Sequence, residues 1–149
     1  MLEHDSDSRE ELKRADHLLY VTLKYTKNID VLKNAIRRLV NACDYGILDV
    51  MEYLKEKKKI KDIPLMPITR AEEVKKYLKK PELVEFIDFY LMLKKVDRAE
   101  FTKREEFKKN VRLVIVDEND ETFEINIEKL YEFFEKTKEF IKYVEDNYK

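Results

Sequence analysis

Few side chains in this sequence have the types and spacing that chemistry requires. The chain has a single glycine, which excludes the glycine-rich loops that bind phosphates and dinucleotides. Its one cysteine, Cys43, and its two histidines, His4 and His17, are too few for a Cys/His metal site. A carboxylate-only metal site stays open, although no spacing of the acidic residues selects one. We therefore expect no metal and no cofactor.

The possible nucleophiles have simpler structural interpretations. Cys43 lies on an apolar helical stripe, which favours a small buried side chain over a reactive thiol. His17 is the one realistic base for a hydroxyl–histidine nucleophile, but an ordinary helix residue is the simpler interpretation. Asp88 interrupts the apolar run from Phe86 to Leu93, so we expect it to be buried and paired. No second carboxylate clusters with it identifiably, which favours a structural ion pair over a catalytic acid.

One column of polar residues is the best candidate for binding. Arginine and asparagine give directional hydrogen bonds, whereas the other solvated faces of this chain are mostly lysine and glutamate. On a helix, positions i, i+4, i+7 and i+11 share a face, and four residues occur at that spacing: Asn34, Arg38, Asn41 and Tyr45, bordered by Arg37 and Asp44. The column is suited to a ligand, an RNA backbone or a partner subunit. A solvated face with an internal ion pair is the alternative.

The charge balance limits the partners and the location. The 31 basic and 32 acidic side chains give a net charge of −1, so only a local patch is available to attract nucleic acid. The charged fraction of 42% is typical of proteins from hot environments, with a lysine-biased genome as the alternative. The single cysteine and a start without a basic or apolar leader predict a cytoplasmic protein. The longest apolar run is too short to cross a membrane.

The elements that must position these residues are mostly helices. A length of 149 residues predicts one domain, 1–149. The strongest pattern predicts a helix from Asn28 to about Lys57, with apolar residues spaced by threes and fours. Gly46 lies on its apolar side, which predicts a close approach of another helix. A capping box formed by Ser8 and Glu11 predicts the start of an earlier helix, antiparallel to the long one because the break between them is short.

The second half of the chain alternates between helical and extended patterns. Capping boxes predict a short helix from Thr69 and a helical turn over Lys103–Lys109, and Pro81 predicts the start of another helix. Alternating residues then predict a β-hairpin of Val111–Val116 with Thr122–Asn126, followed by a last helix capped by Asn126. The fold we predict is mainly α: a helical bundle of four to five helices with one β-hairpin before the C-terminal helix.

Two segments carry a resemblance to a known family. The pair formed by residues 16–22 and 35–54, with Ala42–Leu48 at its centre, resembles the helical-hairpin core of the HEPN superfamily. The segment from Phe101 to Ile115, with the hairpin and last helix, resembles the C-terminal part of small archaeal proteins of that shape. The resemblance implies a small α-helical protein of bacteria or archaea, often a homodimer across the hairpin. Many members are ribonucleases in defence or toxin–antitoxin systems.

The catalytic motif of that family is altered in this sequence. The motif is an arginine followed, after four to six residues, by a histidine; here Arg104 is followed by Asn110, and no histidine occurs after His17. Asparagine cannot transfer a proton near neutral pH. The resemblance therefore implies a non-enzymatic interaction or RNA-associated module. The alternatives are a HEPN-like ribonuclease with an unconventional site at Arg104, Asn110 and Arg38, and a structural subunit of an archaeal complex.

Overall fold

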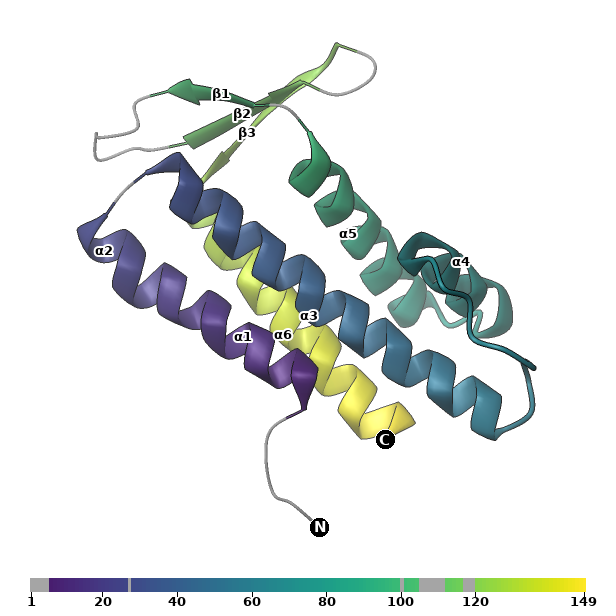
Figure 1. The fold of residues 1–149 in the computed structure, drawn as a ribbon. Coiled ribbons are helices and arrows are strands. Elements are labelled where there is room, and N and C mark those ends of the chain that lie inside the picture. The colour runs from purple at the N-terminus through teal and green to yellow at the C-terminus, as the bar shows by residue number, and fades with distance from the viewer. Residues whose placement is uncertain (1–5, 27, 100, 105–111, 117–119) are drawn as a thin grey trace.

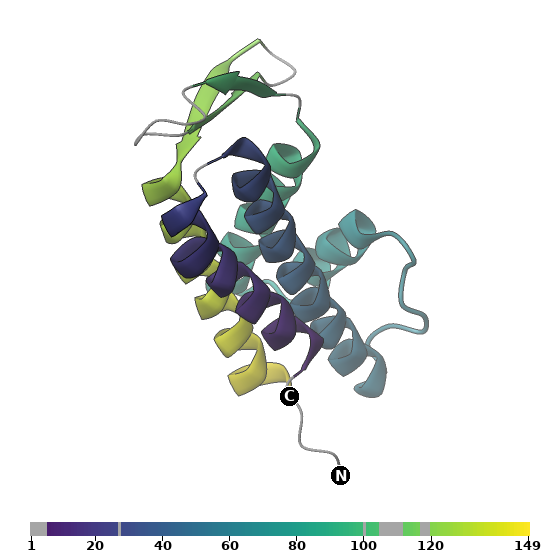
Figure 2. The same ribbon diagram turned by 60° about the vertical axis from the view of Figure 1, so that its left-hand side comes forward.

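The structure is a computed structural model that describes residues 6–26, 28–99, 101–104, 112–116 and 120–149. Its longer helices alternate in direction along a common axis, and a small sheet covers one end of them (Figures 1 and 2). The elements in order are α1 (Asp7–His17), the π-helix η1 (Leu18–Thr22), α2 (Leu23–Tyr25), α3 (Ile29–Glu56), α4 (Pro67–Tyr77), α5 (Pro81–Arg98), β1 (Phe101–Arg104), β2 (Arg112–Val116), β3 (Thr122–Asn126) and α6 (Ile127–Tyr148). The predicted fold class, a helical bundle with a β-hairpin before the last helix, is confirmed.

Helix α3 lies at the centre and confirms the strongest sequence pattern. It begins where Asn28 Oδ1 accepts a hydrogen bond from Val31 N at 2.9 Å, which satisfies one of the free amides at the helix start. Its 28 residues span the length of the bundle. The predicted stripe is buried throughout: Ile29, Leu32, Ile36, Leu39, Cys43, Ile47, Val50 and Leu54. The helix packs against α1, α5 and α6.

Helix α1 begins two residues earlier than the capping pattern predicted. The cap is Ser6, whose Oγ accepts a hydrogen bond from Arg9 N at 3.3 Å, whereas Ser8 is buried inside the first turn. The cap prediction at Ser8 was wrong because the hydroxyl of Ser6, two residues earlier, caps the helix without the acidic partner that the Ser8–Glu11 spacing offers. From Leu18 the helix widens into η1 and then continues as α2. The whole rod runs antiparallel to α3, as predicted (Figure 1).

Helices α4 and α5 correct two further details. Helix α4 begins at Pro67, not at Thr69, because proline is well suited to the first turn, where no amide hydrogen is needed. Helix α5 begins at Pro81, as predicted. Asp88 is exposed on α5, so the prediction of its burial was wrong. Its ion pair is present, however, since Lys75 Nζ lies 2.7 Å from its Oδ1.

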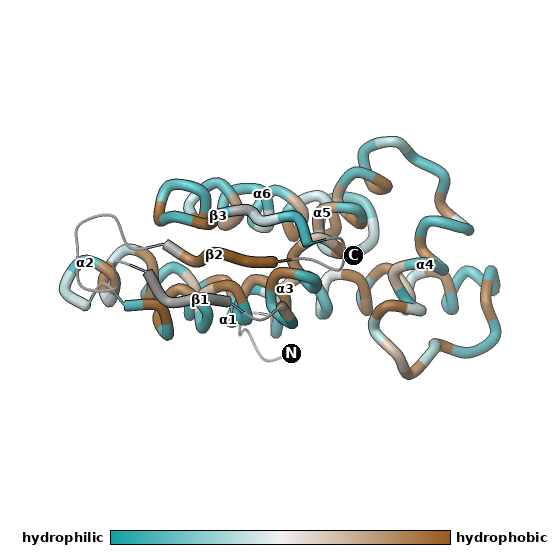
Figure 3. The backbone as a smooth tube through the Cα atoms, turned by 90° about the horizontal axis from the view of Figure 1, so that it is seen from above, coloured by the Kyte–Doolittle hydropathy of each residue, from teal (hydrophilic) through white to brown (hydrophobic). Residues whose placement is uncertain are grey.

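The hairpin prediction is confirmed, and a third strand joins it. Strands β2 and β3 pair antiparallel, with Leu113 opposite Ile125, and both side chains are buried beneath the sheet. Strand β2 lies between β1 and β3, and most of β2 is coloured as hydrophobic in Figure 3. The helical turn predicted over Lys103–Lys109 is wrong at Lys103 and Arg104, which belong to β1. Val111 and residues 105–109 lie outside the described residues.

Helix α6 closes the bundle against α3 and α5. Asn126 caps it as predicted, with its Oδ1 accepting from Lys129 N at 2.8 Å. Gly46 of α3 faces it so closely that an added Cβ would lie 3.0 Å from Ile141 Cδ1 and 3.1 Å from Phe140 Cε2. The predicted close helix approach is therefore confirmed. The aromatic pairs Phe86–Phe140 and Phe89–Phe133, with ring centroids 5.3 and 5.9 Å apart, join α6 to α5.

Candidate interaction cleft between α1 and α3

The predicted polar column turns partly toward α1, where it meets a buried carboxylate. Glu11 of α1 accepts hydrogen bonds from Arg38 Nη1, at 3.3 Å to Oε2 and 3.5 Å to Oε1. Asn41 Nδ2 donates to Glu11 Oε1 at 3.5 Å. Arg14 Nη1 lies 3.6 Å from the same oxygen. Two guanidinium groups therefore share one carboxylate in the seam between α1 and α3.

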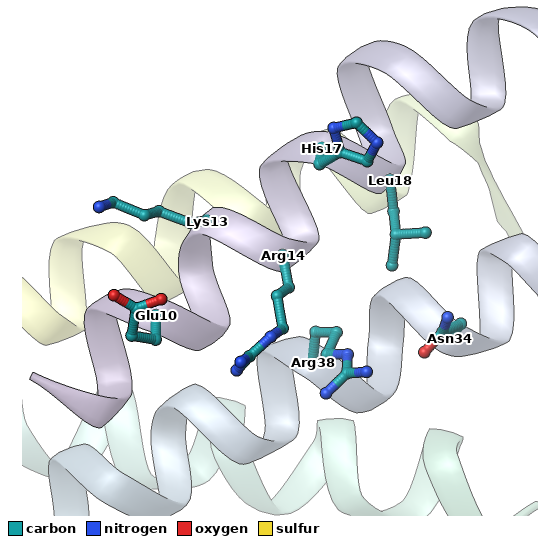
Figure 4. Close-up of a pocket in the computed structure, with 7 residues that line it drawn as sticks. All are labelled: Glu10, Lys13, Arg14, His17, Leu18, Asn34 and Arg38. Atoms are coloured by element: carbon teal, nitrogen blue, oxygen red, sulfur yellow. The ribbon is translucent and has the colours of Figure 1, made fainter. Parts of the chain in front are cut away.

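An open cleft of about 340 Å³ lies beside this cluster. We call it the α1–α3 cleft, and it is lined by Glu10, Lys13, Arg14, His17, Leu18, Asn34 and Arg38. Figure 4 shows Arg14 of α1 and Leu18 of η1 pointing toward α3, whereas Lys13 and His17 project along the outer edge of α1. The cleft therefore has an inner wall of guanidinium groups and an outer edge that carries further nitrogen atoms.

The charge around the α1–α3 cleft favours an anion. Three cationic side chains, Lys13, Arg14 and Arg38, line the cleft together with the carboxylate of Glu10, and the carboxylate of Glu11 lies beside it. Both guanidinium groups contact Glu11 through Nη1, and these contacts do not use the Nε and Nη2 groups of either side chain. Because a planar guanidinium can donate two parallel hydrogen bonds to a phosphate or a carboxylate, this geometry is suited to oxyanions.

The predicted binding residues divide among three environments. Asn34 and Arg38 line the α1–α3 cleft, while Asn41 lies beneath it on Glu11. Tyr45 is 39% exposed farther along α3. Sequence reasoning missed that Lys13, Arg14 and His17 line the same cleft as Arg38. Their spacing along a helix already predicted to lie antiparallel to α3 was the signal for them.

The two residues that border the column face α5 instead of α1. Arg37 Nε donates to Asp97 Oδ1 at 3.3 Å. The hydroxyl of Tyr90 donates a short hydrogen bond to Asp44, and Lys94 Nζ lies 3.9 Å from the other carboxylate oxygen. Burial raises the pKa of Asp44, against the opposing effects of Tyr90 and Lys94. These contacts join α3 to α5: the Asp44 group is partly buried, whereas Arg37 is exposed.

The other candidates for chemistry occupy structural or undescribed positions. Cys43 is fully buried, which confirms its assignment to the core, and burial raises the pKa of its thiol far above the ordinary range. Arg104 lies on β1 opposite Arg112, whereas Asn110 lies outside the described residues. Within the described part of the chain, no three His, Cys, Asp or Glu side chains are grouped so that they could hold a metal ion.

No family model, no curated protein and no solved structure matches the chain. None of the described helices is long and apolar enough to cross a membrane.

Proposed function

We propose that this chain is a non-enzymatic, RNA-associated helical module of the HEPN-like kind, which binds backbone phosphates of RNA in the α1–α3 cleft. The observation that carries the proposal is the convergence of Arg14 and Arg38 on the single carboxylate of Glu11. This arrangement holds two guanidinium groups in place while leaving positive charge in excess. Pre-positioned arginines lose less conformational entropy when they bind a phosphate.

The neighbouring side chains are consistent with a polyanion. Lys13 adds a cation at the outer edge of the cleft, and Asn34 adds an amide that can donate to a phosphate or a ribose oxygen. His17 would add a further donor when protonated. The net charge of −1 over the whole chain predicts weak general attraction, so binding should depend on this local patch.

The test compares two adjacent arginines of α3. Arg38 lines the α1–α3 cleft, whereas Arg37 pairs with Asp97 on the α5 side and is a matched control for the loss of one positive charge. Fluorescence anisotropy with labelled, mixed-sequence single-stranded RNA would measure affinity from low to moderate salt. We expect Arg38→Ala to weaken binding and reduce the salt slope by about one, and Arg37→Ala to leave both near the parent values.

Three results of this test would contradict the proposal. If the parent protein does not bind RNA, the proposal is wrong. Equal losses in Arg37→Ala and Arg38→Ala would show that the cleft has no special role. If Arg38→Ala instead dissociates a co-purified protein at any moderate salt, the face is a protein interface.

A separate assay tests the enzymatic alternative. Purified protein would be incubated with mixed RNA, with and without Mg²⁺ or Mn²⁺. We expect no cleavage, because general acid–base help worth ~100- to 10,000-fold needs a group that can transfer a proton. Cleavage abolished by Arg104→Ala would overturn the non-enzymatic proposal and support the HEPN-like ribonuclease with Arg104 and Asn110 in its site.

A homodimer is the second part of the proposal, and exposed apolar side chains support it. Val21 and Tyr25 lie four and eight residues beyond His17 and are 44% and 80% exposed. A second copy of the chain docked along η1 and α2 would cover them. Light scattering should give twice the mass of one chain for the parent. The double variant Val21→Lys, Tyr25→Lys should give the mass of a single chain. A monomeric parent would contradict this part while leaving the RNA assay unaffected.

A further inference from the structure

A second and larger cleft lies on the opposite side of α3 from α1. Its volume is about 770 Å³, against about 340 Å³ for the α1–α3 cleft. Sites for small molecules generally occupy ~300–1,000 Å³. Three elements form its walls: the outer face of α5, the first turn of α4 at Ile68, and the end of β2. We call it the α5 cleft.

The floor of the α5 cleft is apolar. The floor consists of Leu91 and Met92 from the middle of α5 and of Ile115 and Val116 from β2. Val116 is 46% exposed, so water reaches this apolar surface in the absence of a ligand. A ligand with an apolar body would displace that water and bury the same side chains.

One end of the α5 cleft is cationic. Lys94, Lys95 and Arg98 line it from the last turns of α5. Lys94 is mostly buried and reaches toward Asp44, whereas Lys95 and Arg98 are exposed and, within the described chain, have no carboxylate at salt-bridge distance. Among the described residues of the lining, Asp88 is the acidic one, and Lys75 Nζ lies 2.7 Å from its Oδ1. The helix C-terminus offsets part of this charge, yet two cations still face the cleft.

We propose that the α5 cleft binds a small amphipathic anion: one carboxylate on an unbranched apolar body. The carboxylate would accept hydrogen bonds from Arg98 and Lys95, and the apolar body would lie over Leu91, Met92 and Ile115. Three enclosing walls favour a small molecule over a protein surface, which would need a flatter and larger face. A free fatty acid and other carboxylates with an apolar body share this chemistry, so decanoate can serve as the probe for both.

The experiment is isothermal titration of the full chain with decanoate below its micelle concentration. Decyltrimethylammonium is the control for the head group, because it has the same chain length and the opposite charge. Butyrate is the control for the apolar body. We expect decanoate to bind once per chain, butyrate to bind at least ~10-fold more weakly, and decyltrimethylammonium not to bind.

Variants assign the binding to the α5 cleft. Lys95→Gln with Arg98→Gln should weaken decanoate at least ~10-fold, and Met92→Asp, which places a carboxylate in the floor, should abolish binding. Lys61→Gln, in the exposed segment after α3, is the matched control and should bind as the parent does. Circular dichroism would establish that each variant is folded, since all four positions are outside the fully buried core.

The possible contrary results are distinct. Equal affinity for decanoate and decyltrimethylammonium would leave only apolar binding and overturn the proposal. So would unchanged affinity in the Lys95→Gln, Arg98→Gln variant, or binding without saturation near one equivalent. The outcome is independent of the RNA assay, because the residues of the two clefts do not overlap.

Discussion

Gly46 lies where α3 packs closely against α6. An added Cβ would already lie 3.0 Å from Ile141, so a larger side chain has no space unless the two helices separate. We expect Gly46→Leu to lower the free energy of unfolding by ~1–3 kcal/mol, since overpacking outweighs the helix propensity gained. Tyr45→Leu, at the exposed neighbouring position, should change it by less than ~0.5 kcal/mol. Urea denaturation would measure both, and equal stability of Gly46→Leu and the parent would contradict the argument.

Asp44 gives a residue-scale prediction about pH. Burial raises its pKa above the ordinary value of 3.8, so the folded protein holds this proton to a higher pH than the unfolded chain does. The free energy of unfolding therefore falls as the pH rises from about 3.8 through the raised pKa, because the buried carboxyl must then ionise. Asp44→Asn keeps an acceptor for Tyr90 without the charge. Its stability relative to the parent should increase over that range, and a constant or falling difference would contradict the sign.

At the scale of elements, the register of the sheet determines which side chains of β3 are buried. Ile125 is buried beneath the sheet opposite Leu113, whereas the neighbouring Glu124 is exposed. Ile125→Ser removes buried apolar atoms and introduces a hydroxyl there, so we expect a loss of ~2–4 kcal/mol. Glu124→Ser should cost less than ~0.5 kcal/mol. Thermal denaturation of the two variants would compare them, and similar losses would mean that the sheet lies in another register.

The elements also show which parts of the fold were readable from the sequence. The long helix and the hairpin were predictable because the same apolar periodicity runs over many residues and describes burial directly. Strand β1 was not predictable, since Thr102 and Glu105 have the spacing of a capping box and only pairing with β2 selects the extended form. Ser6 and Ser8 illustrate a smaller ambiguity, in which two residues offer equivalent caps.

At the scale of the whole molecule, α3 separates two clefts of different character. Its polar residues divide between two neighbours: Arg38 and Asn41 turn to Glu11 on α1, and Asp44 turns to Tyr90 on α5. The sequence placed Arg38 and Asn34 on one helical face, which was enough to find one wall of the α1–α3 cleft. The other wall and the whole α5 cleft needed the packing of helices distant in sequence, which periodicity alone does not specify.

An ion pair joins the first helix of the described chain to the last. Arg9 at the start of α1 donates to Glu145 near the end of α6, from Nε at 2.9 Å and from Nη2 at 2.6 Å. These hydrogen bonds lower the pKa of Glu145 below its ordinary value of 4.5. The folded form therefore releases this proton more readily than the unfolded chain, and the pair stabilises the fold above about pH 4.5.

Lowering the pH through the depressed pKa of Glu145 removes that stabilisation, because the carboxyl is then protonated in both states. We expect Glu145→Gln to be less stable than the parent at pH 7 by under ~1 kcal/mol, since about a third of each side chain remains in solvent. The difference should shrink below pH 4.5 and vanish in stronger acid. Glu139→Gln, at an exposed position of the same helix, is the control and should show no such dependence. Denaturant titrations from pH 3 to pH 7 would test this, and a difference that persists in acid would show that Glu145 acts through packing instead of charge.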